Sequence, residues 1–148
     1  MILLPLLLLA QADVVEMPRT LVDGGVCTGL AWVPVPDGAE VFLTEGPDFD
    51  VTCVEMDGVT LFGVYTGGHP QVRPAAGEPL VMIEGYTVQA AQPEANFRGY
   101  LVGNGEYLRN HFFGNVFTDS EGDRAFFENA LFGEEAERRC NPASGADQ

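Results

Sequence analysis

Residues 48–69 read DFDVTCVEMDGVTLFGVYTGGH, and this stretch decides the fold. The dipeptide Asp57-Gly58 separates two runs that are rich in β-branched and aromatic residues. Asp-Gly is favoured in two-residue type I′ hairpin turns, because both central residues of such a turn adopt positive φ. The stretch therefore predicts two antiparallel strands, 49–56 and 59–66, joined by a tight turn.

The turn also predicts the register of this hairpin. The expected cross-strand pairs are, on one face, Met56–Val59, Val54–Leu61 and Thr52–Gly63, and, on the other, Glu55–Thr60, Cys53–Phe62 and Val51–Val64. Both faces are then mostly apolar, which favours a position inside a sheet that is covered on both sides. The Cys53 thiol is expected to lie in the core, with its pKa raised by burial. A metal or catalytic cluster of acids, thiol and His69 is the alternative, and turn chemistry already accounts for Asp57.

The same pattern of strands and turns extends on both sides of the hairpin. Further strands are expected at 40–45, 79–84, 86–91, 96–103 and 106–112. Asn104-Gly105 predicts a second type I′ turn, and Glu84-Gly85 predicts a turn or a bulge. Residues 67–78, GGHPQVRPAAGE, are rich in Gly and Pro and predict a loop. The two prolines of WVPVPDG (32–38) confine that segment to a sheet edge or a loop.

The C-terminal third changes to a helical period. Thr118-Asp119-Ser120-Glu121 resembles a capping box, and the following aromatic stripe predicts a helix over about 119–132 that packs on the sheet. Gly133 is expected to end this helix. The predicted fold is mainly β: an antiparallel sheet of about six or seven strands, as a sandwich or small open barrel, with one C-terminal helix. One domain is expected over 13–140, followed by a disordered tail over 141–148.

The N-terminal residues MILLPLLLLAQA form an apolar run that ends in the small-x-small pattern Ala10-Gln11-Ala12. The run is shorter than the roughly 20 residues that a membrane-spanning helix needs. A signal peptide over 1–12, cleaved before Asp13, is expected, although no Lys or Arg precedes the run. A buried N-terminal strand is the alternative, and the absence of β-branched alternation disfavours it. The mature chain is expected to be periplasmic or secreted, with no membrane span after processing.

Export determines how the three cysteines, Cys27, Cys53 and Cys140, are interpreted. In an oxidising compartment a pair tends to form a disulfide. Cys27 and Cys140 lie in irregular segments, where the required Cα separation is easily reached, whereas Cys53 lies within a strand. A Cys27–Cys140 disulfide with Cys53 as a free thiol is therefore expected, and a Cys27–Cys53 bridge is the main alternative.

The charge of the chain is strongly one-sided. There are 22 acidic and 7 basic residues, a formal net charge of −15, and every basic residue is Arg. Such a surface repels nucleic acid phosphates, so no nucleic acid partner is expected. It attracts cations or a basic protein, and solubility alone is the alternative explanation.

Metal and catalytic chemistry find little support in the sequence. Glu45, Asp48 and Asp50 adjoin a tight turn, but three carboxylates supply about half of the oxygens that Ca²⁺ needs. The segment 119–123, DSEGD, lacks the glycine position of an EF-hand, so no metal and no cofactor is expected. The two serines, Ser120 and Ser144, have no nucleophile-elbow context, and the two histidines are His69 and His111.

These observations predict a small, exported, acidic and non-enzymatic binding or structural module of a bacterial envelope or of the extracellular space. Its partner is expected to be a cationic protein, for example a basic hydrolase that it inhibits. The candidate binding residues are His69, Gly67 and Gly68 in the loop and Asp48 and Asp50 beside it. The alternative is a small secreted hydrolase with its site near His69 and the neighbouring acids.

Overall fold

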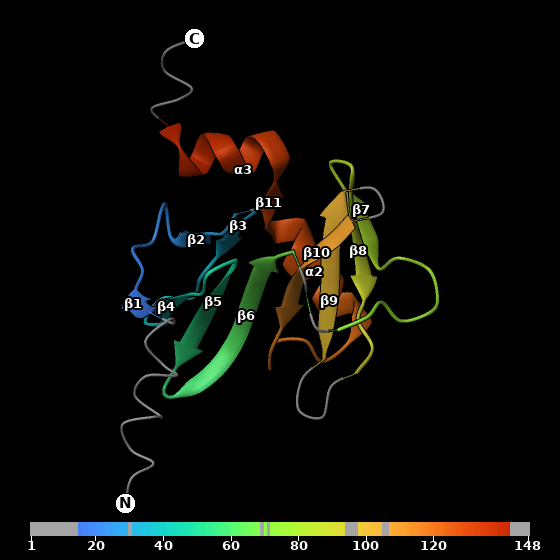
Figure 1. Cartoon of the computed structure of the whole chain (residues 1–148), viewed down its shortest axis with the longest axis horizontal. Helices are drawn as coiled ribbons and strands as arrows, with labels where there is room; N and C mark the ends of the chain where they lie inside the picture. The colour runs from blue at the N-terminus through green and yellow to red at the C-terminus, as the bar shows by residue number, and fades with distance from the viewer. Residues whose placement is uncertain are drawn as a thin grey trace, which may run out of the picture.

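The structure is a computed structural model, and it describes residues 15–29, 31–68, 70, 72–93, 98–104 and 107–142 (Figure 1). The elements in chain order are β1 (Val15–Pro18), β2 (Gly25–Cys27), β3 (Ala31–Pro34), β4 (Glu40–Glu45), β5 (Phe49–Met56), β6 (Val59–Gly67), β7 (Val81–Ile83), β8 (Tyr86–Ala90), β9 (Gly99–Asn104), β10 (Tyr107–Phe113), α2 (Ser120–Asn129), β11 (Leu131–Phe132) and α3 (Gly133–Cys140). The predicted signal peptide, His69 and most of the predicted tail lie outside the described residues.

The expected mainly-β, antiparallel fold is confirmed, with more elements than predicted. Eight strands form one sheet in the order β1-β4-β5-β6-β10-β9-β8-β7, and three form a small sheet in the order β11-β3-β2. Two helices follow instead of one, and α3 lies next to β2, β3 and β11 at the end of the molecule where the C-terminus emerges (Figure 1). The two sheets and α2 contribute to one hydrophobic cluster.

The predicted hairpin forms, with a change of register close to its turn. Asp57 and Gly58 have φ of +53° and +79°, as a type I′ turn requires. Met56 pairs with Val59 as expected, but a bulge then shifts the ladder, so that Val54 pairs with Phe62 instead of Leu61. A bulge places two residues of one strand opposite one of its partner. The sequence does not reveal this bulge, because both faces of the hairpin are mostly apolar and either register buries apolar side chains.

The bulge reverses the predicted surroundings of Cys53. Val54 and Phe62 now share the face that holds the main core, whereas Cys53 pairs with Gly63 and lies on the opposite face. Cys53 is a free thiol, as predicted, but it is half-buried and not part of the core cluster. Burial is still the main cause that raises the pKa of this thiol above its ordinary value of 9.0.

The predicted helix over 119–132 is too long. Its N-cap is Asp119, whose carboxylate accepts a 2.7 Å hydrogen bond from the Gly122 amide, and not Thr118 as the capping-box pattern suggested. The helix ends at Asn129, because the chain becomes extended at Ala130 (φ −84°, ψ 160°) and pairs with β3 through β11. Gly133, expected to end a helix, has φ +62° and begins α3.

Residues 32–38, predicted to form a sheet edge or a loop, also differ from the prediction. β3 is the central strand of the small sheet, between β11 and β2. Its proline, Pro34, is the last residue of the strand, where the missing N–H disturbs the ladder least. The Trp32 indole donates a 2.7 Å hydrogen bond to the Val22 carbonyl, which fixes this strand to the turn before β2.

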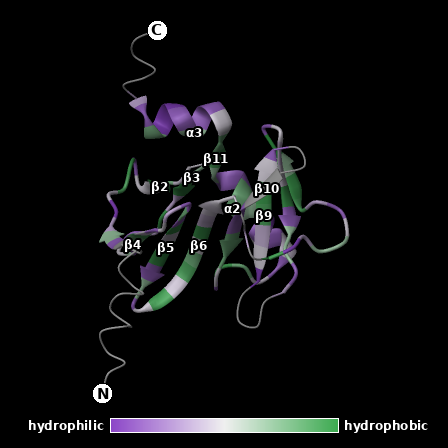
Figure 2. Ribbon diagram, in the orientation of Figure 1, coloured by the Kyte–Doolittle hydropathy of each residue, from purple (hydrophilic) through white to green (hydrophobic). Residues whose placement is uncertain are grey.

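The aromatic side chains of α2 join the helix to the large sheet. Phe127 is fully buried, and its ring contacts those of Tyr100, Phe112 and Phe117. The contacts with Tyr100 and Phe112 are edge-to-face and that with Phe117 is stacked, and aromatic contacts of both kinds add to the stabilisation from apolar burial. In Figure 2, green segments on the strands of the large sheet contrast with the mostly purple α3, so the last helix contributes little to the core.

A partly buried ionic network includes one of these aromatic residues, Tyr100. Asp123 in the first turns of α2 is 1% exposed and accepts a 2.5 Å hydrogen bond from the Tyr100 hydroxyl. The Arg98 guanidinium lies 3.0 Å from the same carboxylate oxygen. Burial, followed by the hydrogen bond to Asp123, raises the pKa of Tyr100 above its ordinary value of 10.0. The network therefore fixes α2 to the start of β9.

The disulfide joins Cys27 and Cys140, the expected pair. Their Cα atoms are 5.9 Å apart, and 113 positions separate them in the sequence. The bond connects the last residue of β2 to the last residue of α3. A disulfide of this kind is typical of a non-reducing compartment.

Candidate functional site

The structure brings most of the predicted binding residues to one end of the large sheet. Asp48 and Asp50 are exposed at the start of β5, and Gly67 lies opposite Phe49 at the end of β6, with Gly68 next to it. Asp50 is also paired across the ladder with the acidic Glu45. His69 is outside the described residues, so the site proposed around it stays a prediction. Within the described ranges, no three His, Cys, Asp or Glu side chains are grouped as a metal site.

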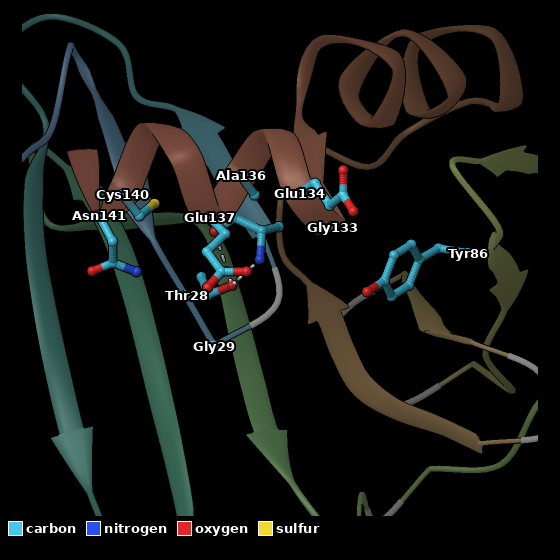
Figure 3. A pocket seen from close by; sticks show the side chains of 10 residues that line it. Thr28, Gly29, Tyr86, Gly133, Glu134, Ala136, Glu137, Cys140 and Asn141 are labelled. Carbon is cyan, nitrogen blue, oxygen red and sulfur yellow. Dashed lines mark hydrogen bonds between the residues drawn. The ribbon is translucent and has the colours of Figure 1, made fainter. Parts of the chain in front are cut away.

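A cavity of about 540 Å³ lies elsewhere, between α3, the β2–β3 turn and β8. We call it the α3 pocket (Figure 3). The lining residues whose side chains matter below are Thr28, Tyr86, Glu134, Ala136, Glu137 and Asn141. These positions are far apart in the sequence, and sequence analysis did not identify the pocket.

Helical spacing places two of the three acids of α3 on the pocket side. Glu134 and Glu137 are three residues apart and line the pocket, and residues at this spacing lie on one helix face. In Figure 3, Glu137 points from α3 towards the Thr28–Gly29 turn, and Glu134 projects on the side of Tyr86. Both side chains are exposed to solvent.

The arginines of α3 line a different hollow from Glu134 and Glu137. Arg138 and Arg139 line a second hollow together with Asp23 and Glu135. The Arg139 guanidinium carbon lies 4.5 Å from the centroid of the Trp32 ring, a cation–π geometry, and its Nε lies 4.0 Å from an Asp23 carboxylate oxygen. No arginine is among the described residues that line the α3 pocket.

The wall opposite the helix is the ring of Tyr86. This ring packs against Phe132, with centroids 5.7 Å apart. At Gly133 the chain bends with φ +62°, a conformation that favours glycine, and α3 begins beside the Tyr86 ring, which an added Cβ would contact at 3.4 Å. Figure 3 shows the Tyr86 hydroxyl on the pocket side of its ring.

The base of the pocket is held by short-range bonds. The Thr28 hydroxyl accepts a 3.0 Å hydrogen bond from the Ala31 amide and donates a 3.2 Å bond to the Ala31 carbonyl. This fixes the β2–β3 turn, and the adjacent Cys27–Cys140 disulfide fixes the end of α3 above it. The pocket walls are therefore preorganised, which lowers the entropy that a ligand must lose on binding.

This arrangement suits a cationic group. Two carboxylates supply hydrogen-bond acceptors of negative charge, and the Tyr86 hydroxyl, on the pocket side of its ring, can accept a further hydrogen bond from an ammonium or guanidinium group. The small apolar side chains Ala31 and Ala136 leave room for an aliphatic stem. Because both carboxylates are exposed, each ion pair is expected to contribute modestly.

Comparisons with known proteins found no match: no family model, no curated protein and no solved structure matches this chain. In the described part of the chain, neither helix has the length and apolar character of a membrane span.

Proposed function

We propose that this chain is an exported, acidic binding domain that recognises a basic protein by holding one of its Lys or Arg side chains in the α3 pocket. The observation that carries the proposal is the division of charge on α3. Glu134 and Glu137 line the pocket, whereas Arg138 and Arg139 line the opposite hollow. A cationic side chain entering the pocket therefore meets two carboxylates and the Tyr86 side chain, and no arginine is among the described residues that line it, although Arg138 lies one helical turn from Glu134.

Two further observations support a basic partner met outside the cytosol. The net charge of −15 gives a negative potential that speeds the approach of a positively charged protein. The Cys27–Cys140 disulfide is of the kind that persists in exported proteins, in accord with the predicted signal peptide. The periplasm and the extracellular space are the compartments that fit both features.

The proposal predicts a specific effect of charge on α3. The mature chain should be retained on immobilised basic proteins, lysozyme among them, at about 0.05 M salt and much less at about 0.5 M, because salt screens exposed charges. The double variant Glu134→Gln/Glu137→Gln should bind about tenfold more weakly, since two charge-assisted contacts are lost. Affinity is measured from retention at each salt concentration.

The matched control is Glu135→Gln. Glu135 belongs to the same helix turn but lines the opposite hollow, so this variant changes the net charge without changing the pocket. Equal losses of affinity in the single variants Glu134→Gln and Glu135→Gln, which change the net charge by the same amount, would show that only overall charge matters. Absence of retention of the unmodified chain on every basic protein at low salt would contradict a basic partner.

A further inference from the structure

A second surface lies on the opposite side of the large sheet from the α3 pocket. An added Cβ at Gly29, beside the pocket, would lie 3.1 Å from Thr66, so the β2–β3 turn is close to Thr66 of β6. Thr66 lies on the same face of β6 as the core residues Val64 and Phe62. The residues of β4, β5, β6 and β10 that point the other way are Phe42, Val51, Cys53, Tyr65, His111 and Phe113, and we call them the outer apolar face.

Every member of the outer apolar face is half-buried. Tyr65 stacks on the neighbouring Phe49 with ring centroids 5.7 Å apart, and the ring centroids of Phe113 and His111 are 5.2 Å apart. By contrast, the rings of Phe62 and Phe112 on the inner face contact α2. The outer face is therefore an apolar surface distinct from the core.

Glycines allow aromatic side chains to lie flat on this face of the sheet. A Cβ at Gly63 would lie 2.5 Å from the Phe113 ring, and one at Gly67 would lie 2.6 Å from the Tyr65 hydroxyl. The two aromatic side chains thus lie against the backbone of neighbouring residues instead of standing up from the sheet. Across four strands spaced at roughly 4.8 Å, the face is about 15–20 Å wide, comparable to the footprint of one helix or two strands.

The border of the face is acidic. Glu16 on β1 and Glu40 and Glu55 on β4 and β5 point to the same side as Cys53. Glu40 and Glu55 are directly paired, and like charges in this position destabilise a sheet. After burial, Glu55 and Glu16 are the further causes that raise the pKa of the Cys53 thiol, so their field reaches the middle of the face. The sequences of β1, β4, β5 and β6 contain no Arg, whereas β10, on the other side of β6, contains Arg109.

We propose that the outer apolar face docks a cationic amphipathic segment of a partner protein, with apolar side chains over Val51, Cys53 and Tyr65 and basic side chains at Glu16, Glu40 and Glu55. The charge of the border selects this occupant. A second copy of the chain would bring two acidic borders together, whereas a basic segment relieves the Glu40–Glu55 repulsion. This site does not depend on the α3 pocket.

The alkylation rate of Cys53 reports whether the outer apolar face is occupied, because Cys53 is a free thiol that lies within this face. The probe is an 18-residue helical peptide of Leu and Lys, with Lys homopolymer and a Leu–Glu peptide as controls. Saturating Leu–Lys peptide should slow alkylation of Cys53 in the mature chain at least tenfold, and neither control should slow it. An unchanged rate with bound Leu–Lys peptide, equal protection by the Leu–Glu peptide, or protection that increases with the concentration of the chain alone would overturn the proposal.

Variants test the two components of the surface separately. Glu40→Gln/Glu55→Gln should weaken peptide binding about tenfold while leaving the chain at least as stable, because the repulsive pair is removed. Tyr65→Ser should also weaken binding, whereas Met82→Ser, which removes a 64% exposed side chain on the distant strand β7, should not. Unchanged affinity in the stable Gln variant would contradict the role of the acidic border, even if Tyr65→Ser fails to fold.

Discussion

Replacing Cys27 and Cys140 together by Ser should lower the free energy of unfolding by about 4–5 kcal/mol, the largest effect expected of any substitution considered. The disulfide spans 113 positions, so it removes a large amount of chain entropy from the unfolded state. Urea denaturation of the mature chain measures the loss. The denaturant slope should also rise, because the unfolded chain without the bridge exposes more surface.

Cys53→Ser is the matched control for this prediction. It makes the same chemical change at a half-buried thiol outside any disulfide, and should cost much less than the double substitution. An unfolding free energy of the double variant within about 1 kcal/mol of the unmodified chain would show that the bridge contributes little beyond positioning α3.

Asp123→Ala should lower the free energy of unfolding by about 3 kcal/mol, the second largest effect expected on stability. The side chain of Asp123 is fully buried, and its removal leaves the Tyr100 hydroxyl without its acceptor and Arg98 without its counter-ion. The loss should be smaller than for a completely buried pair, because the Arg98 side chain is 46% exposed and regains water. Thermal unfolding should show a decrease in Tm of roughly 10 °C.

Glu128→Ala is the control for Asp123. It removes an exposed acid from the same helix and should change stability by less than about 0.5 kcal/mol. If Asp123→Ala and Glu128→Ala have equal effects, the buried network is not a main connection between α2 and the sheet.

Local signals predicted the local features of this fold. The strands at 40–45 and 49–56 have the expected bounds, and Asp57-Gly58 forms the expected turn. Glu84-Gly85, with φ of +53° and +83°, forms the tight turn between β7 and β8. In each case the determinant is the conformational preference of adjacent residues, which sequence displays directly.

Apart from the Cys27–Cys140 disulfide, features that depend on distant partners were not predicted. Leu131-Phe132 fits the helical period that precedes it, and becomes a strand because Trp32 and Ala31 offer backbone partners. Because the predicted helix includes β11 and ends at Gly133, no second helix is predicted from the sequence where α3 forms. The pocket that α3 forms with Tyr86 could not then be recognised, although the i, i+3 spacing of Glu134 and Glu137 was visible.

The central claim is that the α3 pocket binds a cationic side chain, and NMR titration with methylguanidinium tests it most directly. In the ¹⁵N-labelled mature chain, we expect saturable amide shift changes confined to residues around Thr28, Tyr86 and 133–141, abolished in Glu134→Gln/Glu137→Gln and retained in Glu135→Gln. Changes that spread over the acidic surface without saturating, or that centre on Asp48 and Asp50, would contradict the claim.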